Sequence, residues 1–315
     1  MSSIDYVICA RDVKNKAFVA EPGESRFLFV PTPDLPKPSQ AVKKKVFLDA
    51  VMQREGEEVK THDILVFIHG YNNEQEIVMQ RHRLLASSLR AEGYAGQVVS
   101  FDWPSDDKAL NYLEDRCDAK ATALQLVTDC IALFAELQKK GCFVNVHLLA
   151  HSTGAYVIRE AFDDADDRPG IAVANWNVSQ VALIGGDVSS SCMSLGNAKT
   201  SSLYRHMVRL TNYSNLNDSV LKLSNMKRAG VAPRVGRIGL PGEHPPHAVN
   251  VDCTQYYEEQ VAPDGYSLPF YGTKCHSWHI GNPVFTKDLA QTLAGDRDRS
   301  QITTRAIGET GLRLV

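Results

Sequence analysis

The stretch V-H-L-L-A-H-S-T-G-A-Y-V-I at residues 146–158 decides the fold of this 315-residue chain. An apolar run leads into an apolar helix pattern through A-H-S-T-G, which approximates the nucleophile elbow G-x-S-x-G. Strand and helix approach so closely in that turn that the residues two before and two after the serine must be small, as Ala150 and Gly154 are. The sequence predicts that Ser152 stands above a strand end, near a helix N-terminus whose dipole stabilises negative charge. The alternative is a plain strand-to-helix turn in which Ser152 only caps the helix.

The motif H-G-Y-N-N at residues 69–73 directly follows the apolar run I-L-V-F-I at 64–68. Such a run is typical of a strand that is buried on both faces of a parallel sheet. An acyl-transfer site needs two backbone N–H groups that point at the oxyanion. We predict that one belongs to Thr153 and the other to Tyr71, because Gly70 permits a close backbone approach. His-Gly alone is a weak signal, but ahead of an elbow it predicts an oxyanion hole.

A nucleophilic serine also needs an acid and a base, which follow it along the chain in that order. Two acidic residues follow predicted strands: Asp187 comes after V-A-L-I-G-G, and Asp218 comes after V-R-L-T-N-Y-S-N-L-N. The segment K-C-H-S-W-H-I-G-N-P-V-F offers His276 as the base and His279 as the alternative base. The residues by themselves favour His276 and leave both aspartates as candidates for the acid.

Around these motifs, strand and helix patterns alternate over about 230 residues without a break in composition. The predicted strands lie at 64–68, 98–101, 143–150, 181–184, 207–213 and 249–253, the last strand expected. The predicted helices lie at 74–92, at 117–140, from the elbow to about 164, and at 282–293. This alternation predicts an α/β fold with a mostly parallel, doubly wound sheet flanked by helices.

The predicted domain organisation has two parts. Residues 1–60 form an N-terminal extension packed on the core, and residues 61–315 form the main domain. Two short strands and an amphipathic helix are expected within the extension, at 6–9, 27–30 and 41–54. Loop or cap excursions are expected in the main domain, at about 188–203 and 220–275.

The composition is that of an ordinary globular protein, with 43% hydrophobic residues, 23% charged residues and a net charge of −3. This balance excludes a globally basic nucleic-acid binder, and no apolar run approaches the ~18 residues of a membrane span. The N-terminus lacks the positive region of a secretory signal. Seven cysteines without C-x-x-C spacing favour buried free thiols in a reducing compartment. We therefore expect a cytoplasmic protein.

Neither a metal nor an organic cofactor is expected. The segment H-P-P-H at 244–247 has two histidines but no third ligand at helical spacing. No G-x-G-x-x-G motif opens a helix after a strand, so a dinucleotide site has no support.

The chain resembles the α/β-hydrolase superfamily, and within it a bacterial subgroup of unassigned function. The resemblance covers roughly residues 60–295 and rests on F-I-H-G-Y-N-N, a following strand that ends in W-P, the A-H-S-x-G elbow and the late H-S-W segment before N-P. It implies that Ser152 is the nucleophile and His276 the base. The acid of most superfamily members follows the seventh strand of the sheet, which implies Asp218 here.

The sequence departs from the subgroup at two positions. Thr153 stands where the subgroup often has Met, which adds a polar group near the oxyanion hole. Gly186 stands where the subgroup has Pro before an aspartate, which weakens the match around Asp187. Some lipases carry the acid on this earlier strand, so Asp187 stays the alternative acid.

The resemblance implies a serine hydrolase that cleaves carboxylic esters through an acyl-enzyme intermediate. An acyltransferase with the same triad is one alternative, and a non-catalytic relative that binds a ligand or a partner protein is the other. The expected substrate is a small-molecule ester. Aromatic residues gather around the predicted base, and we predict that Tyr271 and Trp278 among them line the substrate pocket.

Overall fold

The computed structural model describes residues 3–52, 61–71, 74–105, 112–135, 143–173, 176–226, 232–309 and 311–315. Six parallel strands form the centre of its sheet, and they lie side by side in the order β5 (Gln97–Asp102), β4 (Thr61–Ile68), β6 (Phe143–His151), β7 (Val178–Ile184), β8 (Met207–Ser214) and β9 (Ala248–Asp252). The run Ile64–Ile68 is buried and pairs on both sides, with β5 and with β6. This double pairing explains why the run is apolar at every position.

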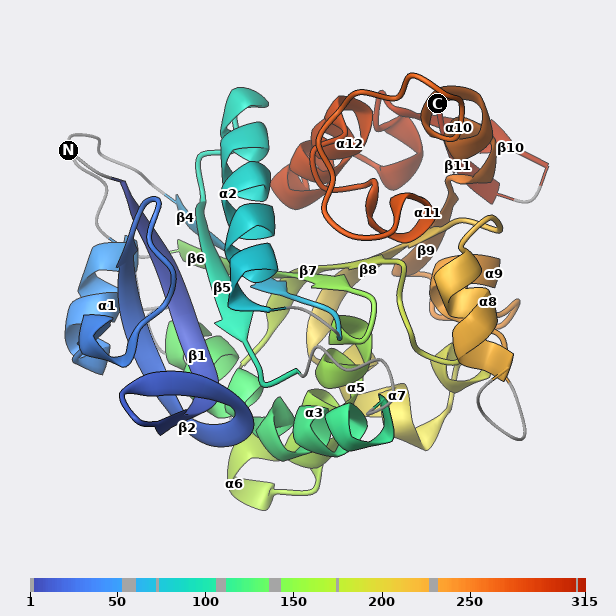
Figure 1. Ribbon diagram of the computed structural model, residues 1–315. Coiled ribbons are helices and arrows are strands. Elements are labelled where there is room, and N and C mark those ends of the chain that lie inside the picture. Colours follow the sequence, from blue (N-terminus) through green and yellow to red (C-terminus); the bar gives the residue numbers. More distant parts are fainter. Residues whose placement is uncertain are drawn as a thin grey trace.

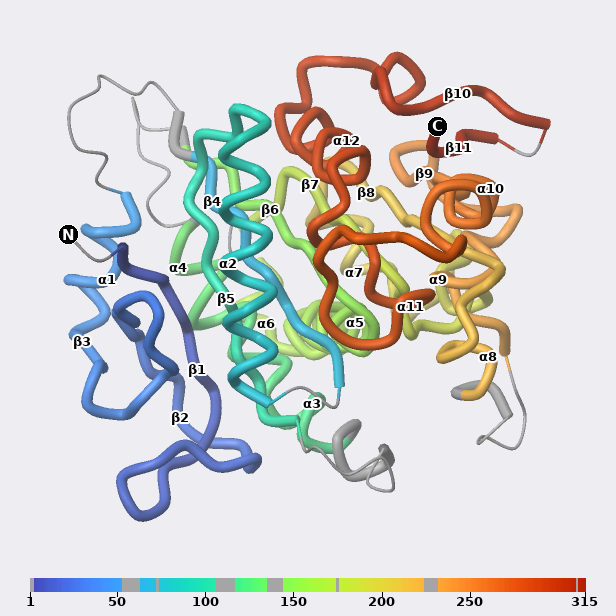
Figure 2. The backbone as a smooth tube through the Cα atoms, turned by 45° about the horizontal axis from the view of Figure 1, so that its top comes forward, coloured from blue at the N-terminus to red at the C-terminus, as the bar shows by residue number. Residues whose placement is uncertain are grey.

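The sheet extends beyond these six strands at both edges (Figure 2). At one edge, β1 (Ile4–Lys14) runs parallel to β5, β2 (Ala17–Pro31) pairs antiparallel with β1, and β3 (Ala41–Val42) pairs with β2. At the other edge, β11 (Gly311–Leu314) runs parallel to β9, and β10 (Arg305–Gly308) pairs antiparallel with β11. The N-terminal segment therefore contributes strands to the same sheet as the rest of the chain.

Helices cover both faces of the sheet (Figure 1). The helices α2 (Gln75–Ala91) and α12 (Pro283–Ala294) lie on one face, where Leu85, Leu89, Phe285 and Leu289 share one apolar cluster. The helices α3 (Tyr112–Leu126), α5 (Gly154–Asp166) and α7 (Ala198–Arg205) belong to the other face. The prediction of a mostly parallel, doubly wound sheet is confirmed.

Shorter elements complete the described part of the chain. The short α-helices are α1 (Lys44–Met52), α4 (Ala132–Ala135), α6 (Pro169–Ala172), α8 (Ser219–Met226), α9 (Val235–Ile238), α10 (Thr254–Tyr256) and α11 (Lys274–Ser277). Two π-helical turns lie at Val127–Ile131 and Tyr257–Val261. Three 3₁₀ turns lie at Pro38–Gln40, Ser190–Met193 and Arg299–Gln301.

Several predicted elements differ in extent from the observed ones. The helix predicted over 117–140 begins earlier, as α3, and continues through the π-helical turn into α4. Residues 136–140 lie outside the described residues, as do residues 53–60, which include the end of the predicted helix 41–54 and the predicted domain boundary. The predicted loop excursion over 188–203 includes the first part of α7, and the excursion over 220–275 includes α9, β9 and α10.

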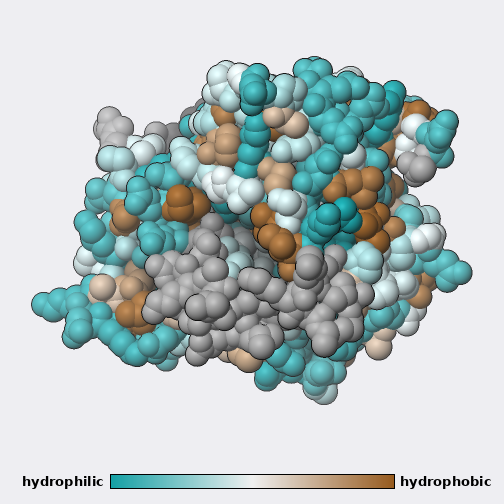
Figure 3. Space-filling view, turned by 45° about the vertical axis from the view of Figure 1, so that its right-hand side comes forward, coloured by the Kyte–Doolittle hydropathy of each residue, from teal (hydrophilic) through white to brown (hydrophobic). Residues whose placement is uncertain are grey.

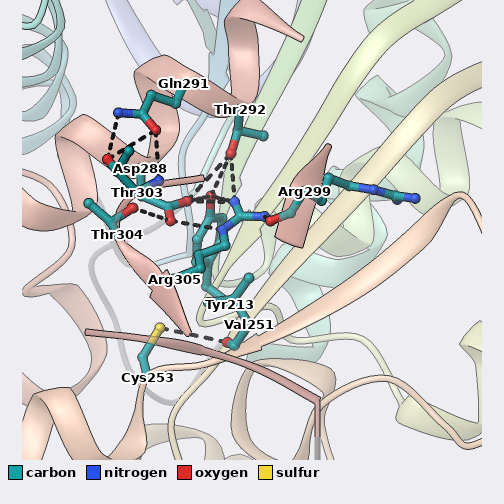
Figure 4. A network of polar contacts seen from close by, with 10 residues as sticks. All are labelled: Tyr213, Val251, Cys253, Asp288, Gln291, Thr292, Arg299, Thr303, Thr304 and Arg305. Atoms are coloured by element: carbon teal, nitrogen blue, oxygen red, sulfur yellow. Dashed lines mark hydrogen bonds and ion pairs between the residues drawn. The ribbon is translucent and has the colours of Figure 1, made fainter. Parts of the chain in front are cut away.

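The prediction that strand 249–253 is the last one was wrong, because β10 and β11 follow it. Each has only four residues, which is too short for a hydrophobic period to be recognised. Figure 4 shows what holds this hairpin: Arg305 of β10 donates from Nε and Nη2 to the Asp288 carboxylate, at 2.8 and 2.6 Å. Tyr213 of β8 donates to the same carboxylate at 2.6 Å, and Thr304 donates to it at 2.7 Å. This buried network ties the C-terminal hairpin to α12 and the sheet.

No described helix is both long enough and apolar enough to cross a membrane. Figure 3 shows a mostly hydrophilic face on which hydrophobic residues form several separate groups. Scattered apolar side chains of this kind are normal for a folded protein.

Six of the seven cysteines lie in the described residues, all as free thiols. The thiols of Cys9, Cys130 and Cys253 are buried, as predicted. Burial is not general, however, because Cys117 is exposed on α3.

Candidate active site

Ser152 lies at a sharp turn between β6 and α5. Its φ of 56° is in the left-handed region, which a residue other than glycine rarely adopts. The end of β7 holds this turn, because the Ser152 N–H donates to the carbonyl of Ile184 at 3.0 Å and the Ser152 carbonyl accepts from the N–H of Asp187 at 3.0 Å. The surrounding structure thus fixes the strained backbone, as expected at a functional site.

Two glycines permit the close packing of this turn. A Cβ atom at position 154 would lie 2.4 Å from the carbonyl oxygen of Ile68, where α5 passes the end of β4. A Cβ atom at position 70 would lie 2.7 Å from the Cβ of Ser152. Ala150, two residues before the serine, is fully buried. The requirement for small residues around Ser152 therefore has a steric cause in the structure.

The predicted base and the first predicted acid meet at this end of the sheet. His276 lies in α11, and its Nδ1 is 2.6 Å from Oδ2 of Asp218, which follows β8. The other carboxylate oxygen of Asp218 accepts the backbone N–H of Leu221 at 2.9 Å. Both side chains are buried. Since a carboxylate only accepts, the contact puts a proton on Nδ1 of His276 and leaves Nε2 as the acceptor of the neutral ring.

Ser152 and His276 line the same cavity, which has a volume of about 180 Å³. Its other described lining residues come from the loop after β4, from α2, from the end of β6, from α8 and from the segment around α11: Tyr71, Ile77, Arg81, His151, Val220, Gly272, Thr273 and Ser277. The cavity lies at the carboxyl ends of the parallel strands, where open α/β sheets bind their ligands.

The alternative acid and the alternative base lie elsewhere. Asp187 forms a buried ion pair with Arg234, in which Nε lies 3.0 Å from Oδ1. His279 is buried in the core, where its ring stacks on Trp278 at 4.2 Å. Burial, and the charge of His276, lower the pKa of His279 to about 3. The structure therefore brings Asp218 and His276 together, and it places Asp187 and His279 outside the residues that line the cavity.

The two predicted oxyanion donors flank the serine. Thr153 immediately precedes the first residue of α5 and is buried. Tyr71 lines the cavity in the loop after β4. Asn72 and Asn73 of the same motif lie outside the described residues. The role of Tyr71 and Thr153 as oxyanion donors stays a prediction.

The predicted aromatic pocket differs from the arrangement in the structure. Trp278 is fully buried and packs on Tyr256, Tyr257 and His279. Tyr271 lines a different cavity, of about 460 Å³, which lies beside β1 and α2. Neither residue is among those that line the cavity at Ser152. Trp278 therefore anchors this segment to the core.

Arg81 and His151 were not predicted as site residues, although both line the cavity. Arg81 donates from Nη1 to Nδ1 of His151 at 3.3 Å, from Nε to the carbonyl of Tyr271 at 3.2 Å and from Nη2 to Oγ of Ser277 at 3.2 Å. His151 donates from Nε2 to the carbonyl of His276 at 3.1 Å. The two side chains therefore connect α2 and the turn at Ser152 to the segment that carries His276.

Burial determines the charges of this pair. It lowers the pKa of Arg81 to about 10, so the guanidinium stays charged at neutral pH. Burial, followed by the charges of Arg81 and His276, holds the pKa of His151 well below its usual value. His151 is therefore neutral, and it accepts at Nδ1 while it donates at Nε2. A sequence signal existed for Arg81, since it is a charged residue four positions after Ile77 on the otherwise apolar face of the helix.

Comparison with known proteins agrees with this fold. Residues 44–249 match the model of a family described as "Alpha/beta hydrolase of unknown function (DUF900)". No curated protein matches the sequence.

Three solved structures are among those similar to the chain. Esterase B from Lactobacillus rhamnosis has 12% identity and a TM-score of 0.43, and the match covers 93% of this chain and 85% of the esterase. A cutinase-like protein from Cryptococcus sp. has 14% identity and a TM-score of 0.36, with 74% and 93% covered. Dienelactone hydrolase from Anabaena variabilis has 17% identity and a TM-score of 0.35, with 82% and 91% covered.

Proposed function

Because the chain belongs to this family of α/β hydrolases, and because its site has the geometry described above, we propose that it is a serine hydrolase that cleaves carboxylic esters. One observation carries the proposal. Ser152, in its strained turn, lines one cavity with His276, whose Nδ1 lies 2.6 Å from the Asp218 carboxylate. A plain strand-to-helix turn would need neither the base nor the acid at this place.

The proposed reaction begins with nucleophilic attack. Oγ of Ser152 bonds to the ester carbonyl carbon while Nε2 of His276 takes the hydroxyl proton. Asp218 holds the ring in the required tautomer and stabilises the imidazolium that forms. The N–H groups of Tyr71 and Thr153 stabilise the oxyanion, and each such donor typically lowers the barrier by ~3–4 kcal/mol.

The second half of the reaction releases both products. The carbon–oxygen bond to the alcohol breaks, and the alcohol leaves with the proton from Nε2 of His276. A water molecule then gives a proton to the same nitrogen and bonds to the acyl carbon. When the ester bond to Ser152 breaks, the serine recovers this proton and the carboxylic acid leaves.

The size of the cavity supports esters with a short acyl chain. A volume of about 180 Å³ is little more than the ~150 Å³ that accommodates benzene in a protein interior. Ile77 and Val220 give this space apolar walls. We expect Val220→Ala to shift the preference toward longer p-nitrophenyl esters and Tyr271→Ala to leave it unchanged. If only Tyr271→Ala changed the preferred chain length of the ester, Tyr271 would be part of the substrate pocket after all.

Labelling with a fluorophosphonate probe tests the proposed function. We expect the wild type and the control variant Ser202→Ala, which changes a buried serine in α7, to be labelled, and Ser152→Ala to remain unlabelled. An unreactive wild type, or labelling that persists in Ser152→Ala, would contradict the proposal and favour a binding protein. Product analysis with an added alcohol distinguishes hydrolysis from acyl transfer, because a transferase would yield a new ester.

A further inference from the structure

A series of buried polar contacts holds the loop that carries the predicted oxyanion donor Tyr71. His69 follows β4 directly and is fully buried, with its ring stacked on that of Trp103 at 5.3 Å. Nδ1 of His69 lies 2.7 Å from the carbonyl oxygen of Gly70, and Nε2 lies 3.2 Å from Oδ1 of Asp102. Trp103 also donates from Nε1 to the His69 carbonyl at 2.8 Å, which fixes the backbone on that side.

We propose that His69 is a positioning residue, held by Asp102 and Arg11, which orients the Tyr71 N–H toward the oxyanion. The inference rests on the proposed function, and it gives the N-terminal strand β1 a part in the active site.

The geometry of the peptide group supplies the reason. A trans peptide is planar, and its C=O and N–H bonds point in opposite directions. The carbonyl of Gly70 and the N–H of Tyr71 belong to the same peptide group. The contact between Nδ1 of His69 and the Gly70 carbonyl oxygen fixes the orientation of this peptide plane. It therefore also fixes the direction in which the Tyr71 N–H points, away from the His69 ring. A preorganised donor of this kind needs no rearrangement when negative charge develops on the substrate.

The His69 ring has two hydrogen-bond acceptors as partners, a backbone carbonyl and a carboxylate. Nδ1 faces the carbonyl of Gly70, and Nε2 faces the carboxylate of Asp102. A charge-assisted contact of this kind is stronger and more directional than one between neutral groups.

Asp102 in turn is held by several side chains. It lies at the end of β5, is fully buried, and accepts from Nε of Arg11 at 2.8 Å and from Nε2 of Gln75 at 2.7 Å. Burial alone would raise the pKa of Asp102, but the charge of Arg11 and the hydrogen bonds from His69 and Gln75 hold it well below its usual range. The carboxylate therefore stays ionised as the anchor of His69.

Arg11 brings β1 into this arrangement. The strand lies beside β5 with Cys9 opposite Asp102, so the Arg11 side chain reaches across the end of β5. Its side chain is 5% exposed and that of Asp102 1%, so the pair is shielded from solvent screening. The chain of contacts runs from the N-terminal strand through Asp102 and His69 to the peptide that presents the oxyanion donor.

The test combines a backbone signal with kinetics. Selective ¹⁵N-tyrosine labelling follows the Tyr71 amide resonance in the wild type, Arg11→Met, Arg11→Lys, Asp102→Asn and the control Lys14→Met. Lys14 lies on the same strand, but its side chain is 53% exposed and pairs with Glu21 at the surface. A short p-nitrophenyl ester gives kcat and KM for each variant.

We expect the Tyr71 resonance to move in Arg11→Met and Asp102→Asn and to stay in place in Lys14→Met. We expect kcat to fall about tenfold in Arg11→Met and ~10–100-fold in Asp102→Asn, below the ~10²–10³-fold loss of a whole donor. KM should change less than about twofold, because the N–H acts in the transition state. Arg11→Lys should recover part of kcat, because it restores the charge.

An unmoved Tyr71 resonance in both Arg11→Met and Asp102→Asn would overturn the inference, as would an unchanged kcat in both within an active protein. If Asp102→Asn does not fold, Arg11→Met and Gln75→Leu carry the same test. If the wild type hydrolyses no ester while the Tyr71 resonance still moves, the proposed function fails and the positioning by His69 stands. The resonance thus separates the two proposals.

Discussion

Nδ1 of His276 lies 2.6 Å from Oδ2 of Asp218, although 58 residues separate the two along the chain. Asp218 lies between β8 and α8, and His276 lies in α11. Asp187, the other candidate for the acid, instead forms an ion pair with Arg234. The distance between side chains therefore favours Asp218 in a choice that the sequence left open.

The first prediction concerns this acid. Asp218→Asn should lower kcat about 10³–10⁴-fold, because an amide cannot hold the imidazole in its productive tautomer. Asp187→Asn should lower kcat less than about tenfold and should mainly reduce stability, because it leaves Arg234 buried without its counter-charge. Steady-state kinetics on a p-nitrophenyl ester, with thermal unfolding measured alongside, checks both variants. A larger kinetic loss in Asp187→Asn would transfer the role of the acid to that residue.

The second prediction concerns the hydrogen bond between His151 and the carbonyl of His276. In His151→Asn the short side chain can still accept from Arg81, as Nδ1 of His151 does, but its amide N–H does not reach the His276 carbonyl. In His151→Gln the longer side chain places an amide N–H near that carbonyl, as Nε2 of His151 does. We expect His151→Asn to lower kcat about tenfold with little change in KM, since one lost buried hydrogen bond costs ~1–2 kcal/mol. His151→Gln should retain most of the activity. Equal kcat values in the two variants would show that the contact with His276 does not matter.

The third prediction concerns the close packing of the nucleophile turn. Gly154→Ala places a Cβ atom 2.4 Å from the carbonyl oxygen of Ile68 and 2.8 Å from that of His69, and backbone atoms cannot easily move aside. We expect a loss of about 3 kcal/mol or more in unfolding free energy and a loss of probe labelling at Ser152. Gly170→Ala is the control, because nothing lies within 4 Å of a Cβ atom there. Urea unfolding of the two variants gives the comparison, and similar midpoints would contradict the steric explanation.

The fourth prediction concerns stability at low pH. Burial, and then the charge of His276, lower the pKa of His279 from 6.5 to about 3 in the folded protein. Between these values the unfolded chain binds more protons than the folded one, so stability falls as the pH decreases from about 6.5 toward 3. For this residue alone the loss reaches at most about 5 kcal/mol. His279→Phe should flatten the dependence of the urea midpoint on pH, and an unchanged slope would contradict the prediction.

Local patterns in the sequence were enough to predict the centre of the fold. The apolar run at 64–68 and the A-H-S-T-G turn at 150–154 reflect constraints within a few residues: burial on both faces of a strand, and a turn that admits only small neighbours. The sharp turn between strand and helix at Ser152, the neighbouring strands and the doubly wound class were accordingly predicted correctly. The C-terminal hairpin was missed, because Arg305 is held in place by Asp288, a contact that no local pattern reveals.

The sequence by itself determined which residue types the candidate site contains and in what order they follow Ser152. Only the tertiary structure decided which of them meet: that Asp218 faces His276, that Trp278 lies in the core, and that Arg11 reaches Asp102 at the end of β5. The physical reason is the range of the forces involved. Backbone sterics and hydrophobic periods act between near neighbours along the chain, whereas hydrogen bonds and ion pairs form between whichever groups the packed sheet brings within about 3 Å of each other.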